Sequence, residues 1–243
     1  MIDNRSGHFP EQNHELIAKI CDRRFGVGAD GLIVLQHHKA VDFAMLYYNA
    51  DGQLGSFCGN GGRCIVAFAK QLGLIDEKTV FAAYDGVHHA TIADDIVSLS
   101  MADVNRISVH TAHVFLDTGS PHHVTFVHDT NDLDVHTKGA QIAHDKRYGT
   151  EGSNVNFVHV DGDHRLRMRT YERGVEAETL SCGTGVTAAV LAAFSVQKIK
   201  TNEVEVHTLG GQLTVSFQQQ GEGFTEIVLT GPTAFVFSGT LSY

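Results

Sequence analysis

One short motif occurs twice in this chain of 243 residues, as Cys58-Gly59-Asn60-Gly61 and as Cys182-Gly183-Thr184-Gly185. The copies lie about half a chain length apart, and each opens a stretch that reads as a helix, at residues 64–70 and 186–191. A duplicated fold would place one cysteine at a helix N-terminus in each half. If the halves face each other, two thiols look across one cleft, which suits removal of a proton from one face of a carbon and its replacement on the other.

The chain has four cysteines, and their simplest interpretations are disulfides, a metal site or buried apolar packing. We see no secretory signal at the start and no apolar run long enough to span a membrane, so we expect a cytoplasmic protein in a reducing compartment, without disulfides. Zinc sites favour closer Cys-x-x-Cys pairs than Cys58 and Cys64 provide. Apolar packing remains the alternative for any single cysteine, but it explains the matched pair poorly.

Charge narrows the choice of partner. The formal net charge is −10 with histidine neutral, which argues against binding to nucleic acid or to an anionic membrane surface. Sixteen histidines are present, but none has a zinc-binding spacing, so we expect no metal site. Nucleic acid and anionic membrane surfaces are therefore not expected as partners.

Strand-like segments dominate the remainder of the chain. Runs rich in β-branched and aromatic residues predict strands at residues 32–35, 44–48, 79–84, 91–101, 113–116, 124–127, 154–158, 166–171, 204–206, 213–215, 226–229 and 234–237. Turn residues follow at 49–52 and 118–122. We therefore predict an α/β (α+β) chain with one half at residues 1–109, joined by a C-terminal strand at 230–243, and a second half at 110–229.

A thiol at a helix N-terminus has a chemical consequence. A free thiol has a pKa of about 8.5, and the helix N-terminus carries roughly half a positive charge with unpaired N–H groups, so the thiolate is favoured there. The N–H groups of Gly59-Asn60 and Gly183-Thr184 would also form a site for a carboxylate. Loss of an α-proton builds negative charge onto that carboxylate, and the helix ends stabilise it. One sulfur must be thiolate and the other thiol.

A series of further segments, in this order, resembles the diaminopimelate epimerase family along nearly the whole chain. They are residues 2–5 (IDNR), 22–31 (DRRFGVGADG), 48–52 (YNADG), 58–64 (CGNGGRC), 119–122 (GSPH), 154–158 (NVNFV), 171–174 (YERG) and 178–185 (ETLSCGTG). The resemblance implies a pyridoxal-independent isomerase that interconverts L,L- and meso-diaminopimelate on the way to lysine and peptidoglycan, with no cofactor. It also implies two pseudo-symmetric domains, each a mainly antiparallel strand barrel around a central helix.

The resemblance assigns roles to particular residues. Cys58 and Cys182 correspond to the two catalytic thiols, whereas Cys64 and Cys21 are interpreted as structural. The family's substrate-contact positions fall on Asn49, Gly59, Asn60, Asn154, Glu172, Arg173, Gly183 and Thr184.

Two of these assignments have plainer alternatives. Arg173 suits the distal carboxylate of the substrate, because a guanidinium binds a carboxylate bidentately; its alternative is a surface ion pair with Glu172 or Glu176. His122 matches a histidine beside the site that helps to set the protonation of a thiol; its alternative is an ordinary loop histidine.

The chain departs from the family pattern in two places. Ser120 stands where the family has asparagine, and a hydroxyl has a shorter reach and only one donor hydrogen. Family members also carry a further strand and a Gly-Asn-Asp-Phe segment ahead of residues 2–5, whereas here Met1 directly precedes Ile2. We therefore expect this chain to fold but to have low activity, and to associate through its first half; a homodimer is the corresponding expectation.

Three other classes remain open. Proline racemases and hydroxyproline epimerases share the two-cysteine logic, but their substrates lack a distal carboxylate. Phenazine-type isomerases would share the fold without the cysteine pair. A binding protein without activity is the third interpretation.

Overall fold

The computed structural model describes residues 1–242, and their packing divides the chain into two compact units. Unit 1 comprises Met1–Leu99 together with the chain from Pro232 onward, and unit 2 comprises Ser100–Gly231. The sequence placed this division between residues 109 and 110. The structure places the segment after Leu99 in unit 2, where the N–H groups of Met101 and Val104 donate to the carbonyls of Ile227 and Phe224. In the same unit, β7 (Ile107–Val109) pairs antiparallel with β8 (Val114–Asp117).

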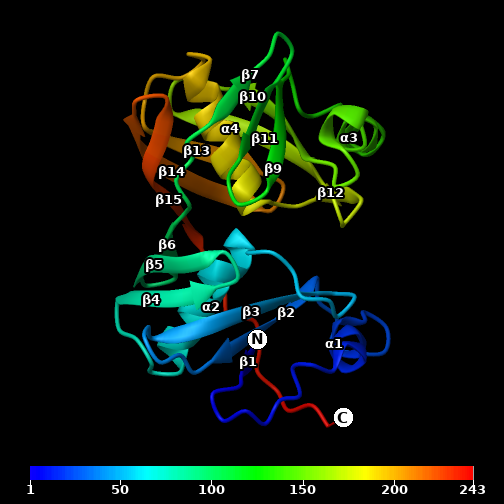
Figure 1. The fold of residues 1–243 in the computed structure, drawn as a ribbon, viewed down its shortest axis with the longest axis vertical. Coiled ribbons are helices and arrows are strands. Elements are labelled where there is room, and N and C mark those ends of the chain that lie inside the picture. The colour runs from blue at the N-terminus through cyan, green and yellow to red at the C-terminus, as the bar shows by residue number, and fades with distance from the viewer. Residues whose placement is uncertain (243) are drawn as a thin grey trace. The chain divides into compact units, whose positions relative to one another are not determined.

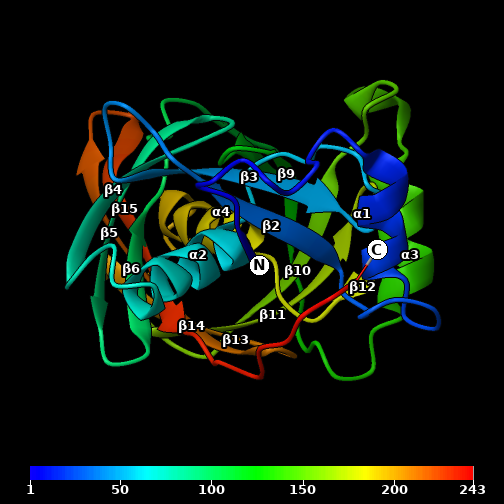
Figure 2. The same cartoon turned by 90° about the horizontal axis from the view of Figure 1, so that it is seen from below.

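Unit 1 is a sheet with two helices packed on it (Figure 1). Its strands, in sheet order, are β1 (Ile2–Asp3), β2 (Gly31–Gln36), β3 (Phe43–Asn49), β4 (Lys78–Ala83), β5 (Gly86–Ala93) and β6 (Ile96–Ser100). The helix α2 (Gly59–Gln71) lies against β2, β3 and β5, and Figure 2 shows it running beside β2. A shorter helix, α1 (His14–Cys21), packs on β2.

Unit 2 surrounds its central helix more completely. The strands that follow β7 and β8 are β9 (Pro121–Phe126), β10 (Asn154–Val160), β11 (Arg165–Glu172), β12 (Ala177–Thr179), β13 (Glu203–Thr208), β14 (Gly211–Gln220) and β15 (Gly223–Pro232). The central helix α4 (Gly183–Ser195), the yellow helix of Figure 1, contacts β7 to β11, β13 and β14. Two short helical segments, α3 (Val135–Ala143) and the single-turn η1 (Lys146–Tyr148), complete the unit.

The two units repeat one topology. In unit 1 the order is β1-α1-β2-β3-α2-β4-β5-β6, and in unit 2 it is β9-α3-β10-β11-α4-β13-β14-β15, with β12 inserted before α4. The corresponding pairs also agree in direction: β1/β2 and β9/β10 are parallel, as are β3/β4 and β11/β13, and the other pairs within each repeat are antiparallel. The predicted fold class, two related halves with a helix at the centre of a mainly antiparallel sheet, is confirmed.

The helices begin where side chains can cap them. Asn13 accepts a hydrogen bond from the N–H of Leu16 at the start of α1, and Asp134 accepts one from Thr137 at the start of α3. Both helices are missing from the sequence prediction, because each is short and only its cap marks it. The helix α4 is buried around nearly its whole circumference, which agrees with its row of small and aliphatic residues.

Three local predictions were wrong. Residues 91–101 are not one strand but parts of β5 and β6, which turn at Asp94 with φ of +50°. The expected turn at 118–122 is shorter, because β9 already begins at Pro121, and His122 is therefore a strand residue.

The third error concerns the C-terminus. Residues 234–237 form no strand: Thr233 binds the carbonyl of Asp95 through its N–H and its hydroxyl, and residues 234–242 then adopt neither helix nor strand. The alternation of apolar residues gives this segment β propensity, but a strand also needs a neighbour that pairs with its backbone.

Candidate active site

Cys58 and Cys182 occupy the same structural position in the two repeats. Each is the N-cap of a central helix, with extended backbone angles of −110° and 113° for Cys58 and −119° and 112° for Cys182. The Sγ atom of Cys58 accepts a hydrogen bond from the N–H of Gly61, and that of Cys182 accepts one from Gly185, both at 3.4 Å. Because a helix N-terminus and its N–H donors stabilise negative charge, both positions favour a thiolate.

In unit 1 a buried guanidinium lies beside the helix end. Arg63 is 7% exposed, and its Nη2 donates to Oδ1 of Asn60 at 3.0 Å while Nη1 donates to the carbonyl of Gly59 at 3.4 Å. Its Nε is buried without a hydrogen-bond partner. Burial lowers the pKa of Arg63, whereas the nearby Cys64 and Cys58 thiols raise it. Unit 1 therefore carries a desolvated positive charge next to the predicted thiol, which favours anionic sulfur.

The other two cysteines have different surroundings. Burial raises the pKa of the Cys64 thiol within α2 and that of the Cys21 thiol at the end of α1. Cys21 also belongs to an apolar cluster with Ile17 and Val34. A raised pKa makes a thiol a poor base at neutral pH, so these surroundings favour the structural interpretation of both.

Asn49 lies at the exposed end of β3, where the chain turns sharply. Its N–H donates to the carbonyl of Gln53 at 2.9 Å, and its carbonyl accepts from the N–H of Gly52, whose φ is +84°. Glycine is favoured at position 52 because other side chains rarely adopt that backbone conformation.

In unit 2 a chain of hydrogen bonds leads to Cys182. Thr184 Oγ1 lies 3.4 Å from Cys182 Sγ, 2.9 Å from Nε2 of His122 and 3.2 Å from Oγ of Ser120. Ser120 in turn accepts from Nδ2 of Asn154 at 3.2 Å. Three of the residues predicted at the site, Asn154, Thr184 and His122, are thus joined to Cys182, and Ser120 fills the place of the family asparagine within the same network.

His122 is a buried strand residue and not a loop histidine. Its pKa is lowered to about 3, first by burial and then by the positive charge of Arg173. The imidazole is therefore neutral at neutral pH, with one N–H and one acceptor nitrogen. A neutral ring of this kind positions hydrogen bonds; it does not deliver a proton as an imidazolium.

The end of β11 carries Glu172 and Arg173. The backbone N–H of Arg173 donates to Oδ1 of Asn154 at 3.1 Å, and its Nη1 donates to the carbonyl of Glu151 at 3.0 Å. Arg173 forms an ion pair with the exposed carboxylate of Glu151 at 3.8 Å. Glu172 accepts a short hydrogen bond from the hydroxyl of Thr179. A surface ion pair at 3.8 Å contributes little to stability.

Sequence reasoning missed several members of these networks: Arg63, Thr118, Asn156 and Thr170. Thr118 fixes the helix end, since its hydroxyl donates to the carbonyl of Thr184 at 2.9 Å. A signal for Asn156 was present, because Asn154 and Asn156 are two residues apart on one strand and so point to the same face. No comparable signal marked Arg63, whose importance comes from burial.

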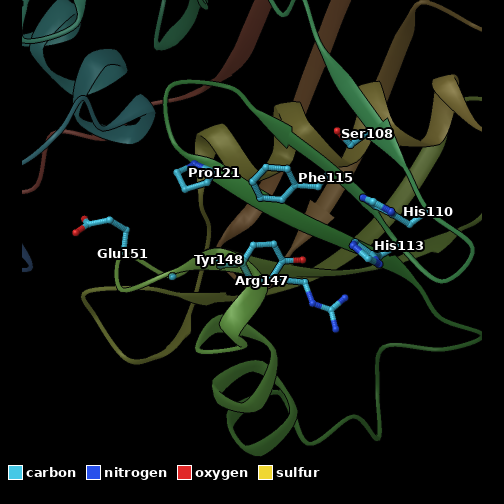
Figure 3. A pocket seen from close by; sticks show the side chains of 9 residues that line it. Ser108, His110, His113, Phe115, Pro121, Arg147, Tyr148 and Glu151 are labelled. Carbon is cyan, nitrogen blue, oxygen red and sulfur yellow. The ribbon is translucent and has the colours of Figure 1, made fainter.

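A separate hollow of about 630 Å³ lies on unit 2 and is lined by none of the predicted site residues (Figure 3). Phe115, Tyr148 and Pro121 line it together with His110 and His113. Among residues 1–242, no group of three or more His, Cys, Asp and Glu side chains is arranged to hold a metal. No helix in the described part of the chain is long and apolar enough to cross a membrane.

Solved structures share this fold at low sequence identity. A phenazine biosynthesis protein of the PhzF family from Bacillus anthracis matches with a TM-score of 0.72 and 14% identity, over 95% of this chain and 89% of that one. A probable proline racemase from Agrobacterium radiobacter matches with a TM-score of 0.70 and 17% identity, over 96% of this chain and 82% of that one. These similarities establish the fold.

Sequence comparison identifies the family. The family described as diaminopimelate epimerase matches residues 1–107 and 114–236. The diaminopimelate epimerase of Flavobacterium psychrophilum is 53% identical over 242 residues, which cover 99% of this chain and 94% of that protein. That of Chlorobaculum tepidum is 40% identical, over 100% of this chain and 96% of that protein. Together with the matched cysteine caps of its two repeats, these similarities show that the chain belongs to the diaminopimelate epimerase family.

Proposed function

We propose that this protein interconverts L,L- and meso-diaminopimelate, with Cys58 and Cys182 as the two acid–base groups. The observation that carries the proposal is the matched pair of cysteine caps, each with its sulfur 3.4 Å from a backbone N–H of the helix it caps. A single activated cysteine would suit nucleophilic chemistry equally well. Two activated cysteines in equivalent positions of a repeated fold suit a reaction in which a proton is removed from one face of a carbon and added to the other.

The helix ends bind the α-carboxylate in this mechanism. The first N–H groups of a helix have no partner within the helix and point outward. Those of Gly59 and Asn60 on α2, and of Gly183 and Thr184 on α4, donate to the carboxylate oxygens. When the α-proton leaves, its electron pair delocalises into the carboxylate, and the same donors stabilise the added charge more strongly than they stabilise the bound ground state.

The proton transfers balance without an oxidant or cofactor. One sulfur enters the cycle as thiolate and removes the α-proton, becoming a thiol. The other enters as thiol and donates its proton to the opposite face of the carbon, becoming a thiolate. The stereocentre is inverted, and the two sulfurs have exchanged protonation states. The reverse direction uses each sulfur in the opposite role, so the pair titrates as one coupled unit.

The ends of β3 and β11 supply specificity in this proposal. Arg173 binds the distal carboxylate, and Asn154, whose amide oxygen already holds the backbone of Arg173 at 3.1 Å, sets its position. Asn49, Asn60 and Glu172 contribute further polar contacts to the amino and carboxylate groups. A substrate with only one carboxylate would leave the guanidinium without its partner, which disfavours proline-type substrates.

Release of deuterium tests the proposal. The protein is incubated with α-deuterated L,L-diaminopimelate in ordinary water, and both the loss of deuterium and the appearance of the meso isomer are followed. We expect both with diaminopimelate, and neither with α-deuterated proline or hydroxyproline. Exchange with proline alone would replace the substrate assignment, and exchange of none of the three would reject the reaction.

A further inference from the structure

Asn156, which has no assigned role, lies at the inner end of the hydrogen-bond chain in unit 2. It is fully buried on β10, and its side chain meets Thr170 on β11 and His122 on β9. Its Oδ1 accepts from the hydroxyl of Thr170 at 3.1 Å. Its Nδ2 lies 3.4 Å from the backbone carbonyl of His123, which can only accept a hydrogen bond. These two neighbours fix which end of the amide is the donor.

The orientation of this amide decides the tautomer of His122. Nδ2 of Asn156 lies 3.0 Å from Nδ1 of His122. Because Nδ2 is a donor, Nδ1 must accept, and the single hydrogen of the neutral ring is then on Nε2. That hydrogen faces Thr184 Oγ1 at 2.9 Å.

The ring hydrogen limits where the hydroxyl hydrogens can go. Nε2 of His122 lies 3.0 Å from Oγ of Ser120 as well as 2.9 Å from Oγ1 of Thr184, and while it carries a hydrogen neither hydroxyl can donate to it. Ser120 accepts from Asn154 and can donate to Thr184 Oγ1 at 3.2 Å, and the hydrogen of Thr184 can then be directed to Cys182 Sγ at 3.4 Å. With the opposite tautomer, Nε2 would be an acceptor that competes with Cys182 Sγ for the hydrogen of Thr184.

We infer that Asn156 is a positioning residue for Cys182, because it holds His122 as the Nε2–H tautomer, which cannot accept the hydrogen of Thr184 and so leaves that hydroxyl to donate to the sulfur. The inference deepens the proposed function and rests on the role given there to Cys182. It assigns Asn156 no contact with substrate. Its effect is on the anion at Cys182, because a donor directed at sulfur stabilises the thiolate.

Nitrogen chemical shifts of His122 provide the first test, and they need no turnover. In the full chain labelled with ¹⁵N-histidine, His122 is assigned by comparison with His122→Gln. We expect the pattern of a neutral ring with hydrogen on Nε2 at neutral pH. A ring with hydrogen on Nδ1, or a charged ring, would overturn the inference whatever the reaction proves to be.

Alkylation rates provide the second test. Asn156→Leu removes the donor to Nδ1, and iodoacetamide labelling of each cysteine is then followed by peptide mass spectrometry. We expect the labelling of Cys182 near neutral pH to slow roughly three- to ten-fold, the equivalent of one net hydrogen bond, while Cys58 in the same molecules keeps its rate. Equal rates at Cys182 in the variant and the wild type would reject the inference.

Thr170→Val is the matched control. It removes the hydrogen bond to Oδ1 of Asn156 but keeps the Nδ2 donor beside His122, which the His123 carbonyl still holds in place. We expect this variant to lose stability and yet label Cys182 at the wild-type rate. If both variants slow labelling equally, the effect is general loosening of the buried network and Asn156 has no specific role.

Discussion

The first turns of α2 and α4 share one backbone design and have opposite surroundings. A Cβ atom added at Gly61 would lie 3.0 Å and 3.1 Å from the apolar side-chain ends of Ile33 and Met45. A Cβ atom added at Gly185 would lie 2.5 Å from Oδ1 of Asn156. Ile33 and Asn156 are each the third residue of corresponding strands, β2 and β10. One helix end is therefore supported by hydrocarbon and the other by an amide.

The second difference is charge. The fifth residue after Cys58 is Arg63, whose Nη1 donates to the carbonyl of Gly59, and the fifth after Cys182 is Thr187, whose hydroxyl donates to the carbonyl of Gly183 at 3.1 Å. The same helix carbonyl is thus bound by a buried cation in unit 1 and by a neutral hydroxyl in unit 2. The caps make the two sulfurs alike, and their surroundings give one a cation and the other a neutral hydrogen-bond chain.

The cysteines themselves are expected to give the largest effects. Cys58→Ala and Cys182→Ala should each lower epimerisation by about 10²- to 10⁴-fold, since neither face can perform the other's proton transfer. The measurement is turnover of diaminopimelate at equal protein concentration. Cys64→Ala, in the same helix as Cys58, should retain most of the activity. Near wild-type turnover by Cys58→Ala or Cys182→Ala would show that the two cysteines do not have equivalent catalytic roles.

The corresponding strands β3 and β11 end differently. β3 ends at the uncharged Asn49, whereas β11 is followed directly by the guanidinium of Arg173. Arg173→Lys should raise KM by the equivalent of about 2 kcal/mol, since a point charge cannot replace a bidentate fork. Asn49→Ala, at the end of β3, should have a smaller effect. An unchanged KM in Arg173→Lys would make Arg173 only the surface partner of Glu151.

Acid should destabilise unit 2 through two buried histidines. Burial lowers the pKa of His122 and of His123 to about 3. Between the ordinary value of about 6.5 and 3, the unfolded chain binds protons that the folded chain does not, so the free energy of unfolding falls as pH falls, by up to about 1.4 kcal/mol per pH unit for each histidine. Urea unfolding at about pH 6 and about pH 4 measures the slope.

His122→Gln and His123→Gln should each make this slope shallower. A slope that does not respond to either buried histidine would mean that both are already charged in the folded protein.

Alanine at the two equivalent glycines tests the difference in packing directly. Gly185→Ala places a methyl group against a fixed amide, and we expect a loss of about 1–3 kcal/mol of unfolding free energy. Gly61→Ala meets the flexible ends of two aliphatic side chains, and we expect a loss below about 1 kcal/mol. Urea denaturation compares them. Equal losses of unfolding free energy in the two variants would show that the Asn156 side chain moves aside for a methyl group as easily as Ile33 and Met45 do.

Removal of the buried cation should have the smallest effect on rate. Burial lowers the pKa of Arg63, and Cys64 and Cys58 act in the opposite direction, so by reciprocity Arg63 favours anionic sulfur at Cys58. Arg63→Met should therefore move the alkylation profile of Cys58 to higher pH and leave that of Cys182 in place. Thr187→Val, its counterpart on α4, should change neither profile. A shift at both cysteines would mean that the substitution perturbs more than local charge.

Much of the fold and part of the site could be predicted from the sequence. Most strands fell where β-branched and aromatic runs placed them, and the two cysteine motifs marked the starts of α2 and α4. The helices α1 and α3 were missed because a single cap residue, Asn13 or Asp134, is a weak signal by itself. The strand expected at residues 234–237 failed because propensity does not supply a pairing partner.

The sequence by itself determined the local chemistry of this protein. A cysteine followed by Gly-x-Gly at the start of a helix meets backbone N–H donors within three residues, and that geometry needs no distant part of the chain. Tertiary structure alone decided what surrounds each sulfur. His122 becomes a neutral donor and Arg63 a buried cation only because folding removes water from them, and Asn156 reaches His122 across 34 positions of sequence. Desolvation and long-range contact are properties of the packed chain, and no local pattern of residues encodes them.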